Sequence, residues 1–371
     1  MATDKLGLYV HIPYCVRKCN YCDFCSLPNG RGEVPDSYVD TLCREIESYA
    51  SVPKRMLDTV YFGGGTPSLL SPRQAERIVL AIRDAFDLSD PVEFTFEANP
   101  GTVTEQKALA FRSLGFNRVS LGLQSVHEDE MRTLGRIHNF DDFVFSFNLL
   151  RKAGFDNINV DLMYGIPHQT KESFRQTLES VIALSPEHIS AYGLILEEGT
   201  PLYEKRDQLP IPTTDEECDM YDLCRDVLRA AGYEHYEISN YAKEGKRSRH
   251  NLLYWNFDWY IGVGAAAHSF YEGIRSYNTQ DVEAYISSPE AVKTQECDLD
   301  LPFEYAMLKL RLIDGFSLSD YEAHFGRSFT EGKEKTLLRL KDEGLITLDA
   351  GRIALTERGF YLSNSILVEI L

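Results

Sequence analysis

The sequence has 371 residues, of which 43% are hydrophobic, and a formal net charge of −19. This length is enough for a buried core and more than one domain, and the acidic excess argues against nucleic-acid binding, which depends on clustered Lys and Arg. No apolar run approaches the ~20 residues of a membrane span. The first residues, MATDKLGLYV, lack the features of a secretory signal. We therefore expect a cytoplasmic protein without an intrinsic membrane anchor.

From residue 6 to about 196, short β-rich runs alternate with amphipathic helical segments. The predicted strands lie at 7–12, 58–63, 92–98, 118–124, 157–165 and 188–196. Between them, apolar residues recur every three or four positions at 37–50, 73–86, 105–115, 141–154 and 171–184. Strands that alternate with helices in this way predict a parallel sheet with helices outside it. The sheet is either open and doubly wound or an incomplete barrel.

A Pro-rich polar connector at 199–214 ends this alternation. A predicted helix at 214–231 follows, and then an irregular, aromatic-rich block at 233–278. Near the C-terminus, LITLD and RIALT flank an Ala-Gly turn, which is typical of a small winged-helix-like unit. We therefore expect three parts: the βα unit with its cysteine loop, the connector with an α+β aromatic region, and a C-terminal helical module that packs rather than reads DNA. Their predicted limits are 1–198, 199–300 and 301–371.

Chemically active residues collect where the predicted strands end. The cysteine segment follows the first strand, GGGTP follows the second, and Glu97, Gln124 and Asp161 lie at or near the ends of the next three. The carboxyl ends of parallel strands meet at one edge of a sheet or barrel, where active sites are built. We therefore expect these segments to form one site.

The segment YVHIPYCVRKCNYCDFCSLP contains four of the eight cysteines. In a reducing compartment, clustered cysteines are more often metal ligands than disulfides. Cys15, Cys19 and Cys22 have the spacing C-x3-C-x2-C, which suits a cubane iron–sulfur cluster with one iron free to bind a small chelating molecule. A zinc or redox site is the alternative, since Cys22 and Cys25 form a C-x2-C pair. The remaining cysteines are expected to be buried as small apolar side chains: Cys43, Cys218, Cys224 and Cys297.

This spacing after the first strand of a βα unit resembles the radical S-adenosylmethionine (SAM) superfamily. The resemblance implies a partial (β/α)6 barrel, a 4Fe-4S cluster on Cys15, Cys19 and Cys22, and SAM chelated by the open iron. GGGTP would hold the methionyl amine, and it is not a P-loop because no Gly-Lys-Ser/Thr follows. The residues implied as SAM contacts are Tyr9, Tyr21, Gly64, Gly65, Thr66, Glu97, Gln124, Arg136 and Asp161. Taken alone, Glu97 and Asp161 would be strand-end caps or ion-pair partners, but the convergence of several strand ends favours binding.

The phrase YVHIPYC together with GGGTP resembles the branch that contains oxygen-independent coproporphyrinogen III oxidase and the HemW haem chaperones. The oxidases have an extra amino-terminal segment, whereas this sequence has eight residues before Tyr9. The oxidases also place their additional cysteine one residue closer to the cluster ligands, so we assign no role to Cys25. HNLLYW at 250–255 matches the HNxxYW signature of the chaperones, in which His250 is regarded as the haem contact. Both features favour the chaperones.

The aromatic block itself is suited to a macrocycle. Histidine is a common axial ligand of haem iron, and flat apolar surface is offered by Tyr254, Trp255, Phe257, Trp259 and Tyr260. By composition alone, these side chains would instead form a core between barrel and tail, with His250 hydrogen-bonded in place. Further candidates are His268 for the iron and Arg247 and Arg249 for the propionates.

The resemblance therefore implies a haem chaperone that binds a 4Fe-4S cluster, SAM and haem and delivers haem to haem proteins, such as membrane respiratory enzymes. The alternative is an oxidase that uses SAM to convert propionate side chains to vinyl groups. A purely structural role would require the cysteine loop to bind nothing. For the chaperone we assign no catalytic residue and expect no nucleic-acid partner, and the sequence leaves a homodimer open.

Overall fold

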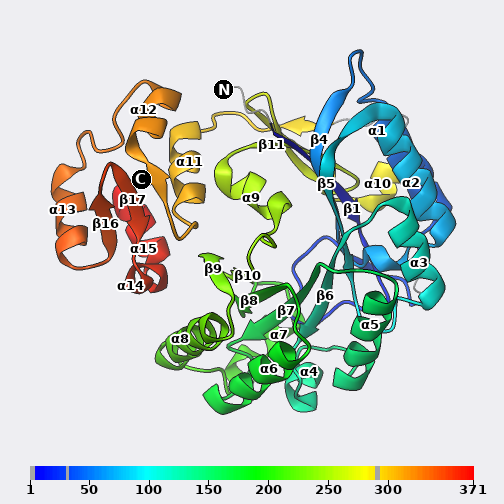
Figure 1. Ribbon diagram of the computed structural model, residues 1–371, viewed down its shortest axis with the longest axis horizontal. Helices are drawn as coiled ribbons and strands as arrows, with labels where there is room; N and C mark the ends of the chain where they lie inside the picture. Colours follow the sequence, from blue (N-terminus) through cyan, green and yellow to red (C-terminus); the bar gives the residue numbers. More distant parts are fainter. Residues whose placement is uncertain (1–4, 31–32, 289–292) are drawn as a thin grey trace.

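Seven parallel strands form the centre of the protein, for which a computed structural model describes residues 5–30, 33–288 and 293–371 (Figure 1). Their order across the sheet is β11 (Trp259–Val263), β1 (Leu6–Ile12), β4 (Arg55–Gly64), β5 (Phe86–Ala98), β6 (Arg118–Gln124), β7 (Ile158–Tyr164) and β8 (His188–Gly193). Each neighbouring pair in this series is parallel. The predicted strands are confirmed, and β1 to β8 follow the chain order of a partial barrel.

Helices cover the outer face of these strands (Figure 1). They are α1 (Asp36–Glu47), α2 (Pro72–Ala85), α3 (Glu105–Leu114), α4 (Glu128–Thr133), α5 (Phe140–Lys152) and α6 (Lys171–Ala183). In α2, Ala75, Ile78 and Ile82 recur at helical spacing and are buried against the sheet. Ser71 accepts a hydrogen bond from the Gln74 backbone N–H at 3.2 Å and so fixes where this helix begins. The apolar residues that recur along the sequence of α2 therefore form the helix face that packs against the sheet.

The middle part of the chain extends both edges of the same sheet. β10 (Asn240–Ala242) and β9 (Glu234–Glu237) continue it antiparallel beyond β8. β12 (His268–Tyr271), β13 (Ile274–Tyr277) and β14 (Thr294–Gln295) continue it antiparallel beyond β11. The expectation of an irregular block at 233–278 was wrong, because strands this short contain too few residues to show an alternating pattern.

Shorter elements connect these layers. α8 (Thr214–Ala230) confirms the helix predicted after the connector, which itself contains α7 (Pro201–Glu204). α9 (Arg249–Asn256) contains the HNLLYW motif and lies between the sheet and the C-terminal module (Figure 1). The cysteine loop contains the two-residue strands β2 (Tyr14–Cys15) and β3 (Leu27–Pro28), and α10 (Val282–Ser287) packs on α1.

The C-terminal residues form a module with its own core. Its helices are α11 (Leu301–Lys309), α12 (Leu318–Phe325), α13 (Glu334–Asp342), α14 (Glu357–Tyr361) and α15 (Ser363–Ile370), and its strands are β15 (Phe316–Ser317), β16 (Ile346–Asp349) and β17 (Arg352–Leu355). β16 and β17 pair antiparallel around Ala350 and Gly351, whose positive φ values of 49° and 75° suit a two-residue hairpin turn. Leu337, Ile353 and Ile366 belong to the buried cluster of this module.

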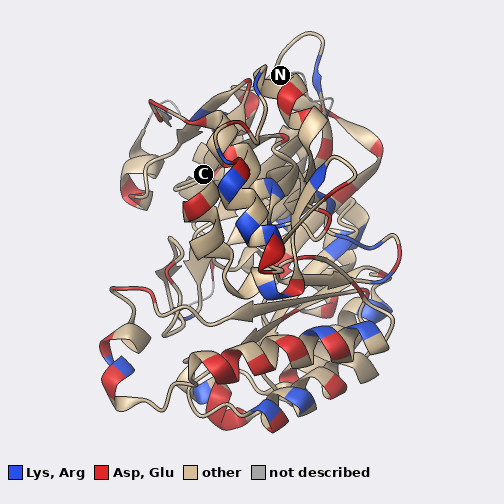
Figure 2. Ribbon diagram, turned by 90° about the vertical axis from the view of Figure 1, so that its left-hand side faces the viewer, with Lys and Arg blue, Asp and Glu red and all other residues tan. Residues whose placement is uncertain are grey.

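Charge is distributed rather than segregated on the face that Figure 2 presents. Acidic and basic residues alternate along its ribbons, within a chain whose net charge is −19. None of the helices in the described ranges combines the length and the hydropathy that a membrane span requires.

A buried carboxylate joins the end of β11 to the helix layer. Glu45 in α1 accepts hydrogen bonds from the Gly264 N–H at 2.8 Å, the Asn278 amide at 2.8 Å and the Tyr285 hydroxyl at 2.7 Å. A buried charge is costly unless such donors satisfy it. These bonds therefore fix the turn after β11, beside the cysteine loop.

Replacing this carboxylate should destabilise the fold. We expect Glu45→Ala to lower the free energy of unfolding by about 3 kcal/mol or more, because three buried donors lose their acceptor. Urea unfolding followed by circular dichroism measures the change. Glu47→Ala, on the exposed face of the same helix, should shift stability by no more than about 0.5 kcal/mol. Equal effects of the two substitutions would contradict this role for Glu45.

Candidate functional site

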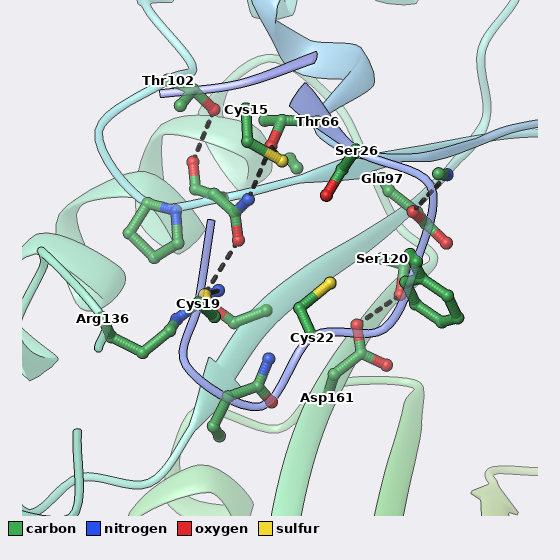
Figure 3. A pocket seen from close by; sticks show the side chains of 18 of the residues that line it. Cys15, Cys19, Cys22, Ser26, Thr66, Glu97, Thr102, Ser120, Arg136 and Asp161 are labelled. Atoms are coloured by element: carbon green, nitrogen blue, oxygen red, sulfur yellow. Dashed lines mark hydrogen bonds between the residues drawn. The ribbon is translucent and has the colours of Figure 1, made fainter. Parts of the chain in front are cut away.

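The carboxyl ends of the parallel strands surround one cavity of about 390 Å³. It is lined by the cysteine loop after β1, the glycine run after β4, the ends of β5 to β8, and Asn251 of α9. Figure 3 shows side chains of the cysteine loop gathered with Glu97 of β5, Ser120 of β6 and Asp161 of β7 around this cavity. The prediction that the segments at the strand ends lie around one site is therefore confirmed.

Three thiols of the loop face this space. Cys15, Cys19 and Cys22 all line the cavity (Figure 3). The Thr66 hydroxyl donates to the Cys15 sulfur at 3.5 Å, and the Arg136 guanidinium donates to the Cys19 sulfur at 3.6 Å. Burial raises the pKa of the Cys15 and Cys22 thiols, so a bound metal centre would be needed to hold them as thiolates.

The other cysteines lie elsewhere. Cys25 is not part of the cavity lining, and its thiol donates to the Gln280 carbonyl at 3.3 Å. Cys43 and Cys224 are buried as expected, but Cys218 is half-buried and Cys297 is exposed, so the expectation of burial was wrong for these two. Within the described residues, no three Cys, His, Asp or Glu side chains are close enough to hold a single metal ion. A cubane spreads its ligand sulfurs more widely than a single tetrahedral ion does, so a cluster does not require such a compact group.

The glycine run lets backbone approach the loop closely. Gly64 has a φ of 107°, and a Cβ there would lie 2.5 Å from the His11 ring. A Cβ on Gly65 would lie 2.7 Å from the Tyr14 carbonyl oxygen. The Gly65 N–H donates to the Ile12 carbonyl at 2.9 Å. Only glycine fits at these positions, and the run forms a narrow wall of backbone along the cavity.

Two half-buried carboxylic residues line the cavity, and one of them is hydrogen-bonded to the glycine run. Glu97 accepts hydrogen bonds from the Tyr61 hydroxyl at 2.8 Å and the Gly64 N–H at 3.1 Å. Asp161 accepts from the Ser120 hydroxyl at 2.7 Å and the Asn159 amide at 2.8 Å. Burial raises the pKa of Asp161 and raises that of Glu97 to about 7. Glu97 therefore changes charge near neutral pH.

Two further side chains have polar atoms without a partner. Gln124 has a φ of 75°, a conformation that non-glycine residues rarely adopt and that persists mainly at functional sites. Its Oε1 and the Nε of Arg136 are buried and make no hydrogen bond within the described structure. Arg136 also donates from Nη2 to the Asn99 side chain and to the Gly122 carbonyl, each at 2.8 Å. Such orphaned groups fit a polar ligand in the cavity.

Nearly all residues expected to contact SAM line this cavity. They are Tyr21, Gly64, Gly65, Thr66, Glu97, Gln124, Arg136 and Asp161. Four further lining residues were not predicted from the sequence: Tyr61, Arg118, Ser120 and Asn159. Arg118 and Ser120 lie an even number of positions before Gln124, and Asn159 lies two before Asp161, so the two-residue period of a strand was a signal that points these three inward. Tyr61 lies three positions before Gly64 and had no such signal.

Tyr9 and His250 do not line the cavity. The Tyr9 hydroxyl lies 3.0 Å from His11 Nδ1. The His250 ring is buried, with Nδ1 2.7 Å from the Thr59 hydroxyl and Nε2 2.8 Å from the Tyr254 hydroxyl. Burial lowers the pKa of His250 to about 3, so the ring is neutral. Both ring nitrogens are occupied, and in this conformation His250 offers no free lone pair to an iron.

The other candidates for haem contacts also have protein partners. Arg247 pairs with Glu234, and Arg249 donates to the Pro91 carbonyl at 2.8 Å. His268 is 3.8 Å from Glu296 and mostly exposed. Phe257 is the buried member of the aromatic block, and its ring centroid lies 4.7 Å from that of Phe270 and 5.7 Å from that of Tyr305. The core interpretation of the block therefore holds for Phe257.

Comparison with known proteins agrees with this geometry. The Radical SAM superfamily matches residues 9–181, and the HemN C-terminal domain matches residues 298–362. Heme chaperone HemW from Lactococcus lactis is 35% identical over 98% of this chain and 96% of its own length. The Escherichia coli protein of that name is 36% identical over 98% of this chain and 97% of its own length.

Among solved structures, Escherichia coli coproporphyrinogen III oxidase HemN, a radical SAM enzyme, has a similar fold. Its TM-score is 0.85 at 24% identity, over 99% of this chain and 90% of that one. The partial barrel with a C-terminal module is thus a shared architecture. With full-length relatives above 30% identity, the chain belongs to the HemW family of haem chaperones within the radical SAM superfamily.

Proposed function

We propose that this protein is a haem chaperone that binds a 4Fe-4S cluster, SAM and haem and delivers haem to haem proteins. The observation that supports it best is the cavity that three thiols, the glycine run and the carboxyl groups of Glu97 and Asp161 line together. Full-length relatives that are 35% and 36% identical are named heme chaperones. The division of labour we propose places cluster and SAM in residues 1–198, the haem motif in 199–300 and a packing module in 301–371.

The cluster would be held by Cys15, Cys19 and Cys22. Bound there, it would supply one-electron chemistry and an open iron site for a chelating ligand. Thr66 and Arg136 donate hydrogen bonds to two of these sulfurs, and such bonds stabilise thiolate charge. Cys25 is left as a neighbouring free thiol.

SAM would occupy the part of the cavity beside the cluster. Its carboxylate suits Arg136, whose guanidinium already lies beside Cys19. Its amine suits the backbone of Gly64 and Gly65, and its ribose hydroxyls suit Glu97, Gln124 and Asp161. Tyr21 packs against the small apolar cluster of Leu134, Met163 and Ile166, which offers a surface for the adenine. Tyr9, which lies outside the cavity, would act only through Tyr61, on which its ring stacks at 6.2 Å.

Haem would bind at the HNLLYW helix. Because both ring nitrogens of His250 are occupied, ligation through His250 requires the Tyr254 or Thr59 hydroxyl to give up its hydrogen bond. We propose that haem acceptors include membrane respiratory enzymes, reached from the cytoplasm through protein contacts, and a homodimer is one arrangement for that transfer.

The second candidate is a decarboxylating oxidase, because the fold is that of HemN and the SAM-facing residues are in place. Anaerobic incubation with coproporphyrinogen III, SAM and a reductant decides between the two. The chaperone should give no protoporphyrinogen IX while its cluster stays intact. Product formation would make the protein an oxidase.

Haem titration of the purified protein tests the chaperone directly. We expect the wild type to bind haem and His250→Ala to bind it at least tenfold more weakly, because a ring that can open toward the iron is lost. His268→Ala, at a mostly exposed position, should bind like the wild type. Unfolding curves of each variant exclude loss of the fold as the cause. A wild-type protein that binds no haem would refute the function.

Substitutions distinguish the cysteines that would hold the cluster from those that would not. We expect Cys19→Ser to lose the cluster and with it SAM-dependent deoxyadenosine formation, because one sulfur ligand is removed. Cys43→Ser should keep both, since this thiol is buried in α1 away from the cavity. Iron and sulfide analysis after anaerobic reconstitution measures the difference. Cluster loss in Cys43→Ser would contradict the assignment.

Glu97 should make SAM binding pH-dependent. Its pKa of about 7 is raised by burial, and a cationic ligand favours the ionised form, so SAM binding should release a proton near neutral pH. Affinity should rise with pH up to about 7 and fall about tenfold for each pH unit below it. Isothermal titration in buffers of different ionisation enthalpy measures the proton release.

Two variants isolate this effect. Glu97→Gln should remove the pH dependence, whereas Tyr61→Phe removes a donor to the carboxylate and should shift the midpoint to higher pH. A wild-type affinity for SAM that does not change between pH 5 and 8 would exclude Glu97 from the site.

A further inference from the structure

The inner end of the cavity contains a buried cation without a protein partner. Arg118, the first residue of β6, is 2% exposed and lines the cavity. Its Nε makes no hydrogen bond, and the guanidinium forms no ion pair with any residue that the structure describes. A buried charge left unpaired is strongly destabilising, so proteins retain one where a ligand supplies the opposite charge.

The nearest carboxyl groups do not supply it. Glu97 and Asp161 feel the charge of Arg118, which lowers the pKa of both against the larger effect of burial. Both oxygens of Glu97 already accept hydrogen bonds from Tyr61 and Gly64. Both oxygens of Asp161 accept from Ser120 and Asn159. No ion pair joins either carboxylate to Arg118 among the described residues, and the Nε of Arg118 has no partner, so its fork stays available for a planar carboxylate.

SAM does not supply it either. The carboxylate of SAM is assigned to Arg136, which contacts the Gly122 carbonyl at 2.8 Å. Gly122 lies four residues beyond Arg118 on β6, which corresponds to about 13 Å along a strand. One SAM molecule has a single carboxylate, and this assignment uses it at Arg136. Arg118 therefore calls for an anion on a second ligand.

The surroundings of Arg118 connect this end of the cavity to the haem motif. Asn251, the residue after His250 in α9, lines the same cavity. Asn251 is thus the residue of the motif that borders the cavity, whereas the His250 ring is hydrogen-bonded to Thr59 and Tyr254. The charge of Arg118 also lowers the pKa of His250, after burial, which places the two side chains within electrostatic reach of each other. A ligand that reaches Arg118 passes beside this helix.

We propose that Arg118 binds a propionate carboxylate of haem at the inner end of the cavity, with the Asn251 amide as a second donor. This inference rests on the proposed haem-chaperone function and adds to it the group that recognises the carboxylate. It assigns to one buried arginine the role that the sequence had suggested for Arg247 and Arg249, both of which have protein partners.

The test compares haem with haem dimethyl ester, whose propionates are blocked. For the wild type, we expect esterification to weaken binding at least tenfold. In Arg118→Met, haem itself should bind at least tenfold more weakly, and esterification should cost at least fivefold less than in the wild type, because the two changes remove the same contact. Arg118→Lys should give an intermediate result, since it retains the charge without the fork.

Controls separate the possible outcomes. Arg249→Met alters an exposed arginine next to His250 and should leave both affinities unchanged. Cluster content after reconstitution verifies the fold of each variant. Should Arg118→Met not fold, the affinities of Arg118→Lys for haem and its ester test the role of Arg118 instead. Equal esterification penalties in the wild type and the Arg118 variants would overturn the role of Arg118 alone. A wild type that binds neither haem nor its ester would overturn the proposed function instead.

Discussion

The pairing of β1 with β4 is the constraint on which the site depends. In this parallel register Ile12 lies opposite Gly64, so the cysteine loop that leaves β1 and the glycine run that leaves β4 begin at the same level. The Gly65 N–H then donates to the Ile12 carbonyl, an approach that a side chain at Gly65 would prevent. Because the two loops start in contact, three thiols and a wall of backbone face a common space before any ligand binds.

The barrel interior beyond this edge is polar, which is unusual for a buried layer and must be satisfied by hydrogen bonds. His188 lies 2.6 Å from the Asn159 side chain and 2.8 Å from the Tyr236 hydroxyl. That hydroxyl also accepts from the Ser248 N–H at the start of α9. A continuous series of hydrogen bonds thus joins Asp161, through Asn159, to the helix that bears the haem motif.

Much of this arrangement was predictable from local patterns. The strands β1 to β8, their helices and the convergence of Glu97, Gln124 and Asp161 follow from periodicity and from the geometry of parallel strands. The partner of His250 at Tyr254 also follows from helical spacing, because residues four apart share a face. Its second partner, Thr59, is 191 positions away in sequence, and no local pattern announces it. The same holds for β11, which joins β1 only through long-range pairing, and for Arg118, whose lack of a partner depends on where every nearby carboxylate points.

The proposed function depends on a 4Fe-4S cluster that Cys15, Cys19 and Cys22 would hold and whose fourth iron would bind SAM. Electron paramagnetic resonance of the anaerobically reconstituted and reduced protein, recorded with and without SAM, tests it most directly. We expect the signal of a reduced 4Fe-4S cluster, and this signal should change when SAM is added, because SAM would bind at the open iron of the cluster. A reconstituted protein without a cluster signal, or a signal that SAM leaves unchanged, would contradict it.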